Sequence, residues 1–127
     1  KIVLEKKKKE YPKTYDKCCH VVQTAFVCDV RLHKGKYYDI FRALAKLIVC
    51  RDAYWKLYGE EMGLGKPWKP DWEDEHQEKY IIGSWLGTIQ GLEENFVSHP
   101  FAFPTEEMRD AFFDNFKEEI EKCKELL

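Results

Sequence analysis

The sequence predicts an α+β fold, with two long helices and a short helix packed on a small antiparallel β-sheet. Apolar residues recur at helical spacing over two long stretches, residues 37–62 and 105–127. A strand-like pattern lies between them, within residues 79–103. The chain has 127 residues, of which 44% are hydrophobic and 15% aromatic, and this is enough to bury the core of one domain.

We expect a single α+β domain spanning residues 1–127, because no linker divides the chain. Residues 1–10 hold an apolar triplet and a run of four lysines, which fits either a flexible basic arm or an edge strand. The net charge of −2 is too balanced to indicate a nucleic-acid-binding protein by itself. No apolar run approaches the roughly 20 residues of a membrane span, so we do not expect a membrane-embedded protein.

The short helix is expected within residues 12–23, where Thr14 is a good N-cap. Residues 24–36 are ambiguous, because a strand-like alternation is interrupted by the sequence HKGK. The first long helix, residues 37–62, ends where Gly63 suits the left-handed cap position.

Irregular chain follows, because Pro67 and Pro70 restrict the residues before them to extended conformations. Three strands are expected, near residues 79–85, 87–91 and 96–103. The last helix, residues 105–127, has Thr105 as its N-cap, acidic residues in its first turn and one apolar stripe along its length. The two long helices would then cover one face of the sheet.

The stretch EEMGLGK, residues 60–66, resembles the phosphate-binding loop that opens motif I of the chromatin-remodelling helicases. Such a loop needs backbone N–H groups at a helix N-terminus, a lysine, and a Ser or Thr hydroxyl that binds magnesium. Here Pro67 occupies the hydroxyl position, and the preceding element is a predicted helix where the motif requires a strand. We therefore expect no nucleotide binding. The stretch is expected to cap the helix at Gly63 and to bend the chain at Pro67.

The five cysteines are an odd count with one adjacent pair, which is a poor disulfide framework and indicates a reducing compartment. One cluster has the residue types of a zinc site, namely Cys18, Cys19, His20, Cys28 and His33. Adjacent Cys18 and Cys19 point about 100° apart on a helix and do not readily chelate one ion together. We expect semi-buried cysteines and no metal, while Cys19 with Cys28 and His33 stays open as an alternative.

The sequence shows no complete catalytic motif. The four histidines are scattered, and no local sequence pairs one of them with a nucleophile. Paired acids such as Glu60/Glu61 and Glu106/Glu107 have the pattern of solvated faces and of a helix start. We therefore expect a non-enzymatic protein with no catalytic residues and no cofactor.

The expected interaction surface consists of Trp68, Trp72, Tyr80 and Trp85, which are aromatic residues without catalytic groups among them. Trp68 and Trp72 lie in the proline-stiffened bend. Two tryptophans in such a loop form a protein-binding surface, a platform on which a sugar stacks, or a part of the core that closes over the long helix. The sequence leaves open which of the three applies.

Three stretches carry a resemblance to a known group: YPKTYDKCC, LIVCRDAYWKLYGEEMGLGKPWKPDW and FAFPTEEMRDAFFDNFKEEIEKCKELL. They cover about half of the chain and resemble an uncharacterised family of small proteins from phages and prophages of Bacteroidales gut bacteria. Members of this family are similar in their helical front, KPDW-type bend, short meander and final helix. The resemblance implies a phage origin, and it implies no functional residue, because the family has no established activity.

The expected function is that of a phage-derived accessory protein, associated with the virion or tail or directed at the host, that acts through contacts with a phage or host protein. Its expected location is the host cytoplasm or the virion, and a homo-oligomer is left open. One alternative is a small-ligand- or carbohydrate-binding module that uses the Trp68/Trp72 bend. A second is nucleic-acid binding through the lysine run at residues 6–9, which we do not favour because no aromatic residues interleave it.

Overall fold

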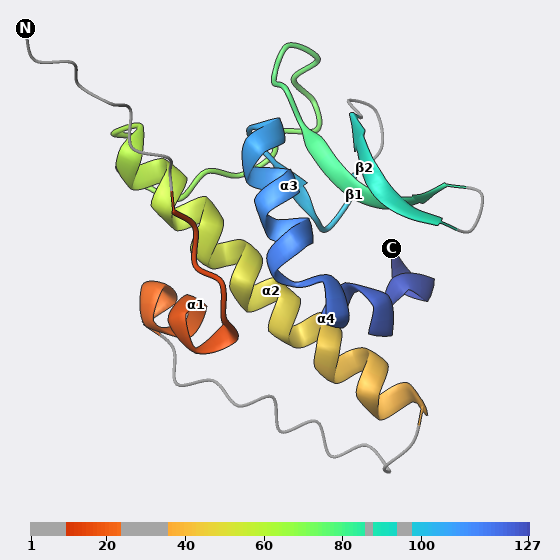
Figure 1. The fold of residues 1–127 in the computed structure, drawn as a ribbon. Helices are drawn as coiled ribbons and strands as arrows, with labels where there is room; N and C mark the ends of the chain where they lie inside the picture. Colours follow the sequence, from red (N-terminus) through yellow and green to blue (C-terminus); the bar gives the residue numbers. More distant parts are fainter. Residues whose placement is uncertain (1–9, 24–35, 86–87, 94–97) are drawn as a thin grey trace, which may run out of the picture.

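The computed structural model describes residues 10–23, 36–85, 88–93 and 98–127, of which residues 36, 84–85 and 88–93 are described by their backbone alone (Figure 1). The elements are α1 (Tyr15–Val22), α2 (Lys36–Glu61), β1 (Tyr80–Trp85), β2 (Thr88–Glu93), β3 (Ala102–Phe103), α3 (Glu106–Asn115), α4 (Lys117–Lys122) and a short 3-10 helix η1 (Lys124–Leu126). The α+β class predicted from the sequence is confirmed. The predictions for residues 1–9 and 24–35 fall outside the described residues.

The sheet is antiparallel, with β1 between β2 and β3. β1 pairs with β2 along its whole length, and with β3 only at Tyr80 and Ile81. The strand predicted at residues 96–103 was wrong in its length, although residues 96–97 lie outside the described part. Pro100 accounts for part of the shortening, because proline has no N–H to donate to a ladder.

α1 begins and ends at residues that satisfy its terminal backbone groups. The Thr14 hydroxyl accepts the Lys17 N–H at 3.2 Å, as predicted for an N-cap. The helix ends at Gln23, which has a left-handed φ of 55° and donates its N–H to the carbonyl of His20. α1 packs along α2 and buries Cys18 there completely.

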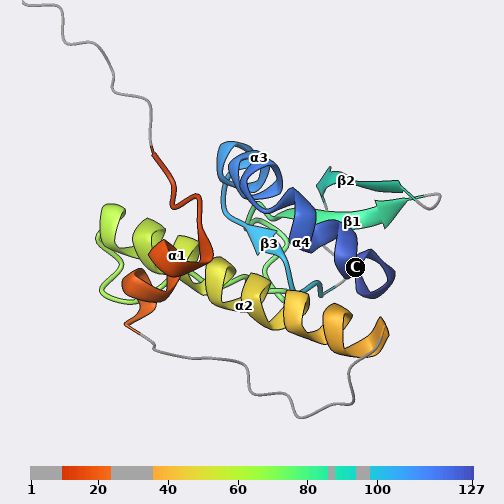
Figure 2. The same ribbon diagram turned by 60° about the horizontal axis from the view of Figure 1, so that its bottom comes forward.

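α2 has 26 residues and runs along one side of the molecule, with the sheet on the opposite side in the view of Figure 2. Its end follows the prediction. Gly63 has a φ of +67°, and the Leu64 N–H bonds back to the carbonyl of Gly59 at 2.9 Å. The glycine cap turns the chain sharply away from the helix axis.

The single helix predicted over residues 105–127 was wrong, because the structure divides it into α3, α4 and η1. Thr105 caps α3 as predicted, accepting the Met108 N–H at 3.1 Å. The helix breaks at Phe116, where φ is −122° and ψ is 29°. α3 packs on the strands whereas α4 packs on α2. The break lets the chain make both contacts, and it keeps the Phe116 ring buried beside Tyr54.

Tyr54 of α2 lies at the centre of the core and is fully buried. Its hydroxyl donates to the carbonyl of Pro12 at 2.7 Å and accepts from the Asn115 side chain at 3.0 Å. α2 reaches the sheet through the next residue, Trp55, whose indole N–H donates to the carbonyl of Ala102 at 2.8 Å. The expectation was that both long helices cover one face of the sheet. α3, from the second of them, packs on the strands, whereas α2 reaches the sheet at the short strand β3.

Candidate interaction site

The loop between α2 and β1, residues 62–79, first packs back against the end of α2. A Cβ atom built on Gly59 would lie 2.1 Å from the carbonyl oxygen of Lys66. The Trp68 N–H donates to the carbonyl of Trp55 at 3.1 Å. Gly59 therefore permits a close backbone approach that any larger residue would obstruct.

Trp68 belongs to the core, since only 7% of its surface is exposed. Its ring meets Trp55 edge to face, with centroids 5.6 Å apart and planes at 72°. The guanidinium of Arg51 lies 4.3 Å from the Trp55 ring centroid and donates to the carbonyl of Pro100 at 2.9 Å. Of the alternatives that the sequence left open for this tryptophan, the structure selects the core.

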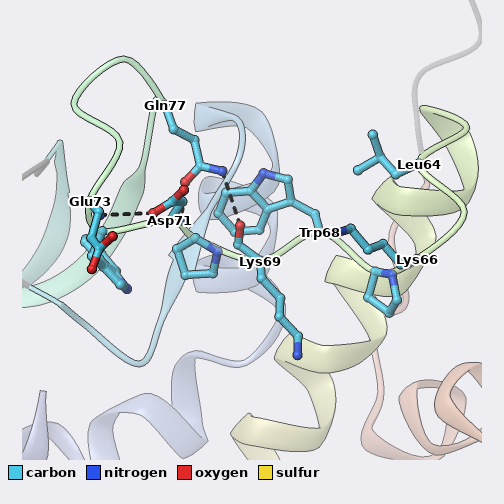
Figure 3. Close-up of a pocket in the computed structure, with 10 residues that line it drawn as sticks. Leu64, Lys66, Trp68, Lys69, Asp71, Glu73 and Gln77 are labelled. Carbon is cyan, nitrogen blue, oxygen red and sulfur yellow. Dashed lines mark hydrogen bonds between the residues drawn. The ribbon is translucent and has the colours of Figure 1, made fainter.

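The rest of the loop is held by its own hydrogen bonds (Figure 3). Gln77 spans it, because its side-chain amide donates to the carbonyl of Lys69 at 3.2 Å and accepts the N–H of Asp71. The Asp71 carboxylate accepts the Glu73 N–H at 3.0 Å, and Asp74 makes a similar turn two residues on. These bonds give the loop a defined shape without regular secondary structure.

Lys79, the residue just before β1, holds the loop through hydrogen bonds from its side chain. Its side chain is fully buried, and its ammonium donates to the carbonyls of Asp74 at 2.8 Å and Gln77 at 3.1 Å. The same ammonium lies 5.5 Å from the ring centroid of Trp72. A buried lysine needs such partners, because burying an uncompensated cation is costly. Lys79 therefore ties the acidic turn and Trp72 to the start of β1.

The outer side of this loop is a hollow with a volume of about 860 Å³. It is lined by Leu64, Lys66, Pro67, Trp68, Lys69, Pro70, Asp71, Trp72, Glu73 and Gln77. Half of these are apolar, and Leu64 is 45% exposed while Trp72 is half-buried. Figure 3 shows Leu64 and Lys66 on one side of Trp68, and Asp71 and Glu73 on the other. The lining thus combines apolar side chains with two lysines and two carboxylates, and the carboxylates lie on the other side of Trp68 from Leu64 and Lys66.

Two of the four predicted interaction residues meet in this hollow, namely Trp68 and Trp72. Tyr80 lies at the start of β1 and does not line it. Trp85 ends β1, and its side chain falls outside the described part of the chain. The prediction of a common surface for all four aromatic residues therefore stays a prediction.

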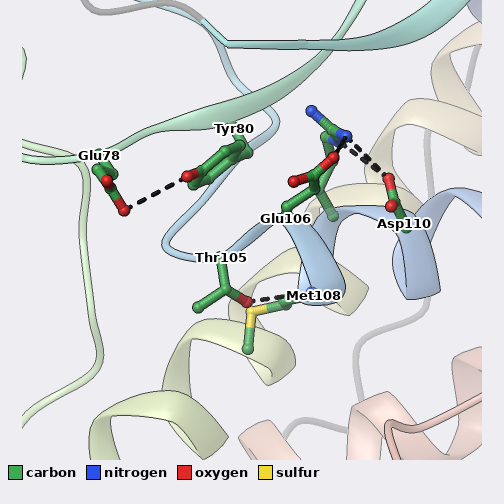
Figure 4. Close-up of polar contacts among 7 residues, drawn as sticks. Glu78, Tyr80, Thr105, Glu106, Met108 and Asp110 are labelled. Atoms are coloured by element: carbon green, nitrogen blue, oxygen red, sulfur yellow. Dashed lines mark hydrogen bonds and ion pairs between the residues drawn. The ribbon is translucent and has the colours of Figure 1, made fainter.

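Tyr80 instead belongs to the contact between β1 and α3. Its hydroxyl donates to Glu78 at 3.3 Å, and the guanidinium of Arg109 lies 5.7 Å from its ring centroid (Figure 4). Arg109 is 8% exposed and pairs with Asp110 at 3.0 Å and with Glu106 at 3.4 Å. These pairs fix the guanidinium where strand and helix meet.

Most residues of the site were not assigned to it from the sequence. Among the lining residues these include Leu64, Gln77 and the charged residues Lys66, Lys69, Asp71 and Glu73, and beside the lining Lys79. The position of Leu64 carried a signal, because an apolar residue between two glycines of a helix-ending turn is readily presented to solvent. No signal in the sequence indicated the roles of Gln77 and Lys79. Their partners are backbone carbonyls and N–H groups of a loop that has no sequence signature.

The resemblance of residues 60–66 to a phosphate-binding loop is not supported by the local structure. Glu60 and Glu61 form the end of α2, and Gly63 and Gly65 have positive φ values in the turn after it. No helix follows Pro67 before β1 in this fully described stretch. The predicted helix cap is confirmed, and no helix N-terminus is available there for a phosphate.

The described cysteines mainly fill the core. Cys18 of α1 and Cys50 of α2 are both buried in the core, and the neighbouring Cys18 thiol together with burial raises the pKa of the Cys50 thiol far above its ordinary value. Burial raises the pKa of Cys123 to about 11. Both thiols therefore stay protonated and unreactive at neutral pH. Within the described residues no three His, Cys, Asp or Glu side chains gather as a metal site requires, and Cys28 and His33 lie outside them.

His99 holds the turn that leads into β3. Its Nδ1 accepts the Phe101 N–H at 3.1 Å, and its Nε2 is buried without a hydrogen-bond partner among the described residues. Burial lowers the pKa of His99, so the neutral ring with its proton on Nε2 is favoured.

No protein-family model matches the chain, and comparison with curated proteins and with solved structures likewise gives no match. Across the described ranges, no helix combines the length and the apolar character that crossing a membrane requires.

Proposed function

We propose that the chain is a non-enzymatic binding protein and that a protein partner docks in the hollow formed by residues 64–77. The observation that carries the proposal is the apolar lining of the hollow, where Leu64, Pro67, Pro70 and Trp72 are exposed or half-buried. A concave apolar surface rimmed by polar groups is typical of interaction sites in soluble proteins.

The shape of the loop supports this proposal, because the hollow exists before a partner arrives. The bonds from Gln77 and Lys79 fix the loop, so binding has less conformational entropy to overcome. Trp72 is the residue that we expect to contribute most, since tryptophan is enriched among the side chains that dominate binding energy. It is half-buried, and its ring is held by the ammonium of Lys79.

We further propose that the protein is a phage-derived accessory protein, acting in the virion or the host cytoplasm on a phage or host protein. The support for this origin is the resemblance of three long sequence stretches to small proteins of Bacteroidales phages and prophages. Tyr80 and Trp85 remain proposed extensions of the interaction surface.

The proposal is tested with three immobilised proteins: wild type, Trp72→Ala and Phe41→Ala. Phe41 is the matched control, because it is 42% exposed on α2 and does not line the hollow. Each protein is incubated with lysate of infected and uninfected Bacteroidales cells, and the bound proteins are identified by mass spectrometry. We expect a partner that the wild type and Phe41→Ala retain and that Trp72→Ala loses. Circular dichroism checks that both variants are folded.

A partner that all three proteins retain equally would show that the hollow is not the interface. A partner that Phe41→Ala loses and Trp72→Ala retains would place the interface on α2 instead. Either result contradicts the proposal while leaving the fold unaffected.

Carbohydrate binding is the second candidate, and the placement of polar side chains beside Trp72 favours it. Asp71, Glu73 and Gln77 line the same hollow and can bond to sugar hydroxyls. The accessible aromatic area argues against it, because Trp68 is only 7% exposed and Lys79 lies over the ring of Trp72. Titration of oligosaccharides with tryptophan fluorescence as the readout tests it, and an unchanged spectrum with every glycan removes it.

Nucleic-acid binding through the lysine run, residues 6–9, is kept as a third prediction, although this run lies outside the described residues. Such binding would appear as retention on DNA that falls with salt, because released counterions drive it. Deletion of residues 1–9 would abolish it. Absence of retention at low salt would exclude it.

A further inference from the structure

The hollow lies in an acidic stretch of the chain, between the end of α2 and the start of β1. Residues 60–79 hold seven carboxylates and three lysines, for a formal charge of −4. One of those lysines, Lys79, is fully buried and bonded to carbonyls. The solvent-facing charge near the hollow is therefore more negative than the formal count.

The charged side chains that line the hollow are not evenly mixed. Lys66 and Lys69 line it together with Leu64, and Asp71 and Glu73 line it beyond Trp68 (Figure 3). Asp74, Glu75 and Glu78 are also exposed. They follow the two lining carboxylates in sequence, within the turn that Lys79 holds, and add negative charge there. An occupant that spans the hollow therefore meets apolar side chains, and a group of carboxylates at the end where Asp71 and Glu73 lie.

We propose that the hollow binds a segment of a partner protein in which apolar residues lie next to lysines or arginines. This rests on the proposed function and names the chemistry of its partner. The apolar residues cover Leu64, Pro70 and Trp72, which removes their exposed surface from water. The basic residues reach Asp71 and Glu73, which are exposed and gain a charge partner.

Charge complementarity separates this occupant from the others. An anionic ligand such as a nucleic acid or a phosphorylated segment would meet net repulsion from residues 60–79. A neutral sugar carries no charge, so its binding would not weaken as salt is added. A purely apolar segment would give the two lining carboxylates no cationic partner, and its binding would not weaken as salt is added.

Three short fluorescein-labelled peptides test the proposal by fluorescence anisotropy. In the first, leucines precede lysines; in the second, glutamates replace the lysines; in the third, serines replace the leucines. We expect the leucine–lysine peptide to bind more tightly than both others, and to bind more weakly as salt is added. Tighter binding of the leucine–glutamate peptide, equal binding of the serine–lysine peptide, or no binding of any peptide would overturn the inference.

Single-charge variants locate the binding within the loop. Glu73→Gln, which alters the lining, is expected to weaken binding of the leucine–lysine peptide by roughly twofold to fivefold. Glu75→Gln is the matched control, because Glu75 is exposed in the same turn and does not line the hollow. Lys69→Gln is expected to strengthen binding by a similar factor, since it removes a like charge. Equal effects of Glu73→Gln and Glu75→Gln would show that the peptide is attracted to the acidic turn without entering the hollow, which contradicts the inference.

The proposed function and this inference fail separately. If Trp72→Ala abolishes capture of a partner but the leucine–lysine peptide does not bind preferentially, only the basic character of the occupant is wrong. If capture does not depend on Trp72 and the peptide does not bind, both are wrong.

Discussion

Replacing Gly59 with alanine is expected to lower the free energy of unfolding by about 1–3 kcal/mol. The new Cβ would lie 2.1 Å from the carbonyl oxygen of Lys66 and 3.0 Å from Cα of Pro67. Both atoms belong to the backbone, so a side-chain rotation cannot relieve the contact. The carbonyl oxygen must move by 1.3 Å to reach an ordinary distance of 3.4 Å.

That displacement acts on the contacts just beyond Pro67. The Trp68 N–H bond to Trp55, 3.1 Å long, would be stretched at a cost of about 1 kcal/mol, and overpacking adds about 1–3 kcal/mol. The change from glycine to alanine inside a helix returns about 1 kcal/mol. The costs exceed the gain, and the net loss of about 1–3 kcal/mol corresponds to a Tm lower by roughly 3–15 °C.

Urea denaturation followed by circular dichroism measures the effect, and tryptophan fluorescence reports whether Trp68 has moved. Glu60→Ala is the control, because Glu60 is exposed in the same turn of α2 and its replacement is expected to change stability by less than about 0.5 kcal/mol. A Gly59→Ala protein that is as stable as the wild type, or more stable, would refute the close approach of the loop to α2.

Three further predictions concern single residues. Lys79→Met should lower the free energy of unfolding by about 1–2 kcal/mol, because the carbonyls of Asp74 and Gln77 lose their donor. It should also make residues 69–78 more sensitive to limited proteolysis. An unchanged cleavage pattern would show that Lys79 does not hold the loop in place. Thr105→Ala should cost about 1 kcal/mol in chemical denaturation, because the Met108 N–H loses its cap, and Thr105→Ser should restore most of it. His99 should make stability depend on pH, because its pKa in the folded state lies below the ordinary 6.5. Its contribution is complete above pH 6.5 and is lost as the pH falls toward the folded pKa, since the unfolded chain then binds the proton more readily. His99→Asn keeps an acceptor for the Phe101 N–H, and unfolding curves above and below pH 6.5 should show that it lacks this part of the decline.

The elements that the sequence predicted well are those with local causes. Thr14 and Thr105 cap helices because their hydroxyls reach N–H groups three residues on, and this requires no tertiary contact. Gly63 ends α2 because glycine adopts a positive φ at little cost. Such signals lie within a few residues of the feature that they determine.

The features that the sequence did not predict have distant causes. The break at Phe116 lies in an unbroken apolar stripe, and it follows from the different packing partners of α3 and α4. The burial of Lys79 follows from carbonyls that a loop presents to it. Neither cause can be read from residues near the feature, because each depends on how separate segments meet in three dimensions.

The two tryptophans of the bend show why the candidate site was only partly predictable, and why experiments must treat them differently. Trp68 bonds to α2 through its backbone and packs on Trp55, so its burial fixes where the loop leaves the helix. Trp72 follows four residues later, after Pro70, and the ammonium of Lys79 holds its ring at the edge of the hollow. Replacing Trp68 would remove core packing and the hollow together, so lost binding in such a variant would say nothing about an interface. Replacing Trp72 or Glu73 changes the lining and leaves the Trp55–Trp68 contact in place, so only variants of this kind separate binding from folding.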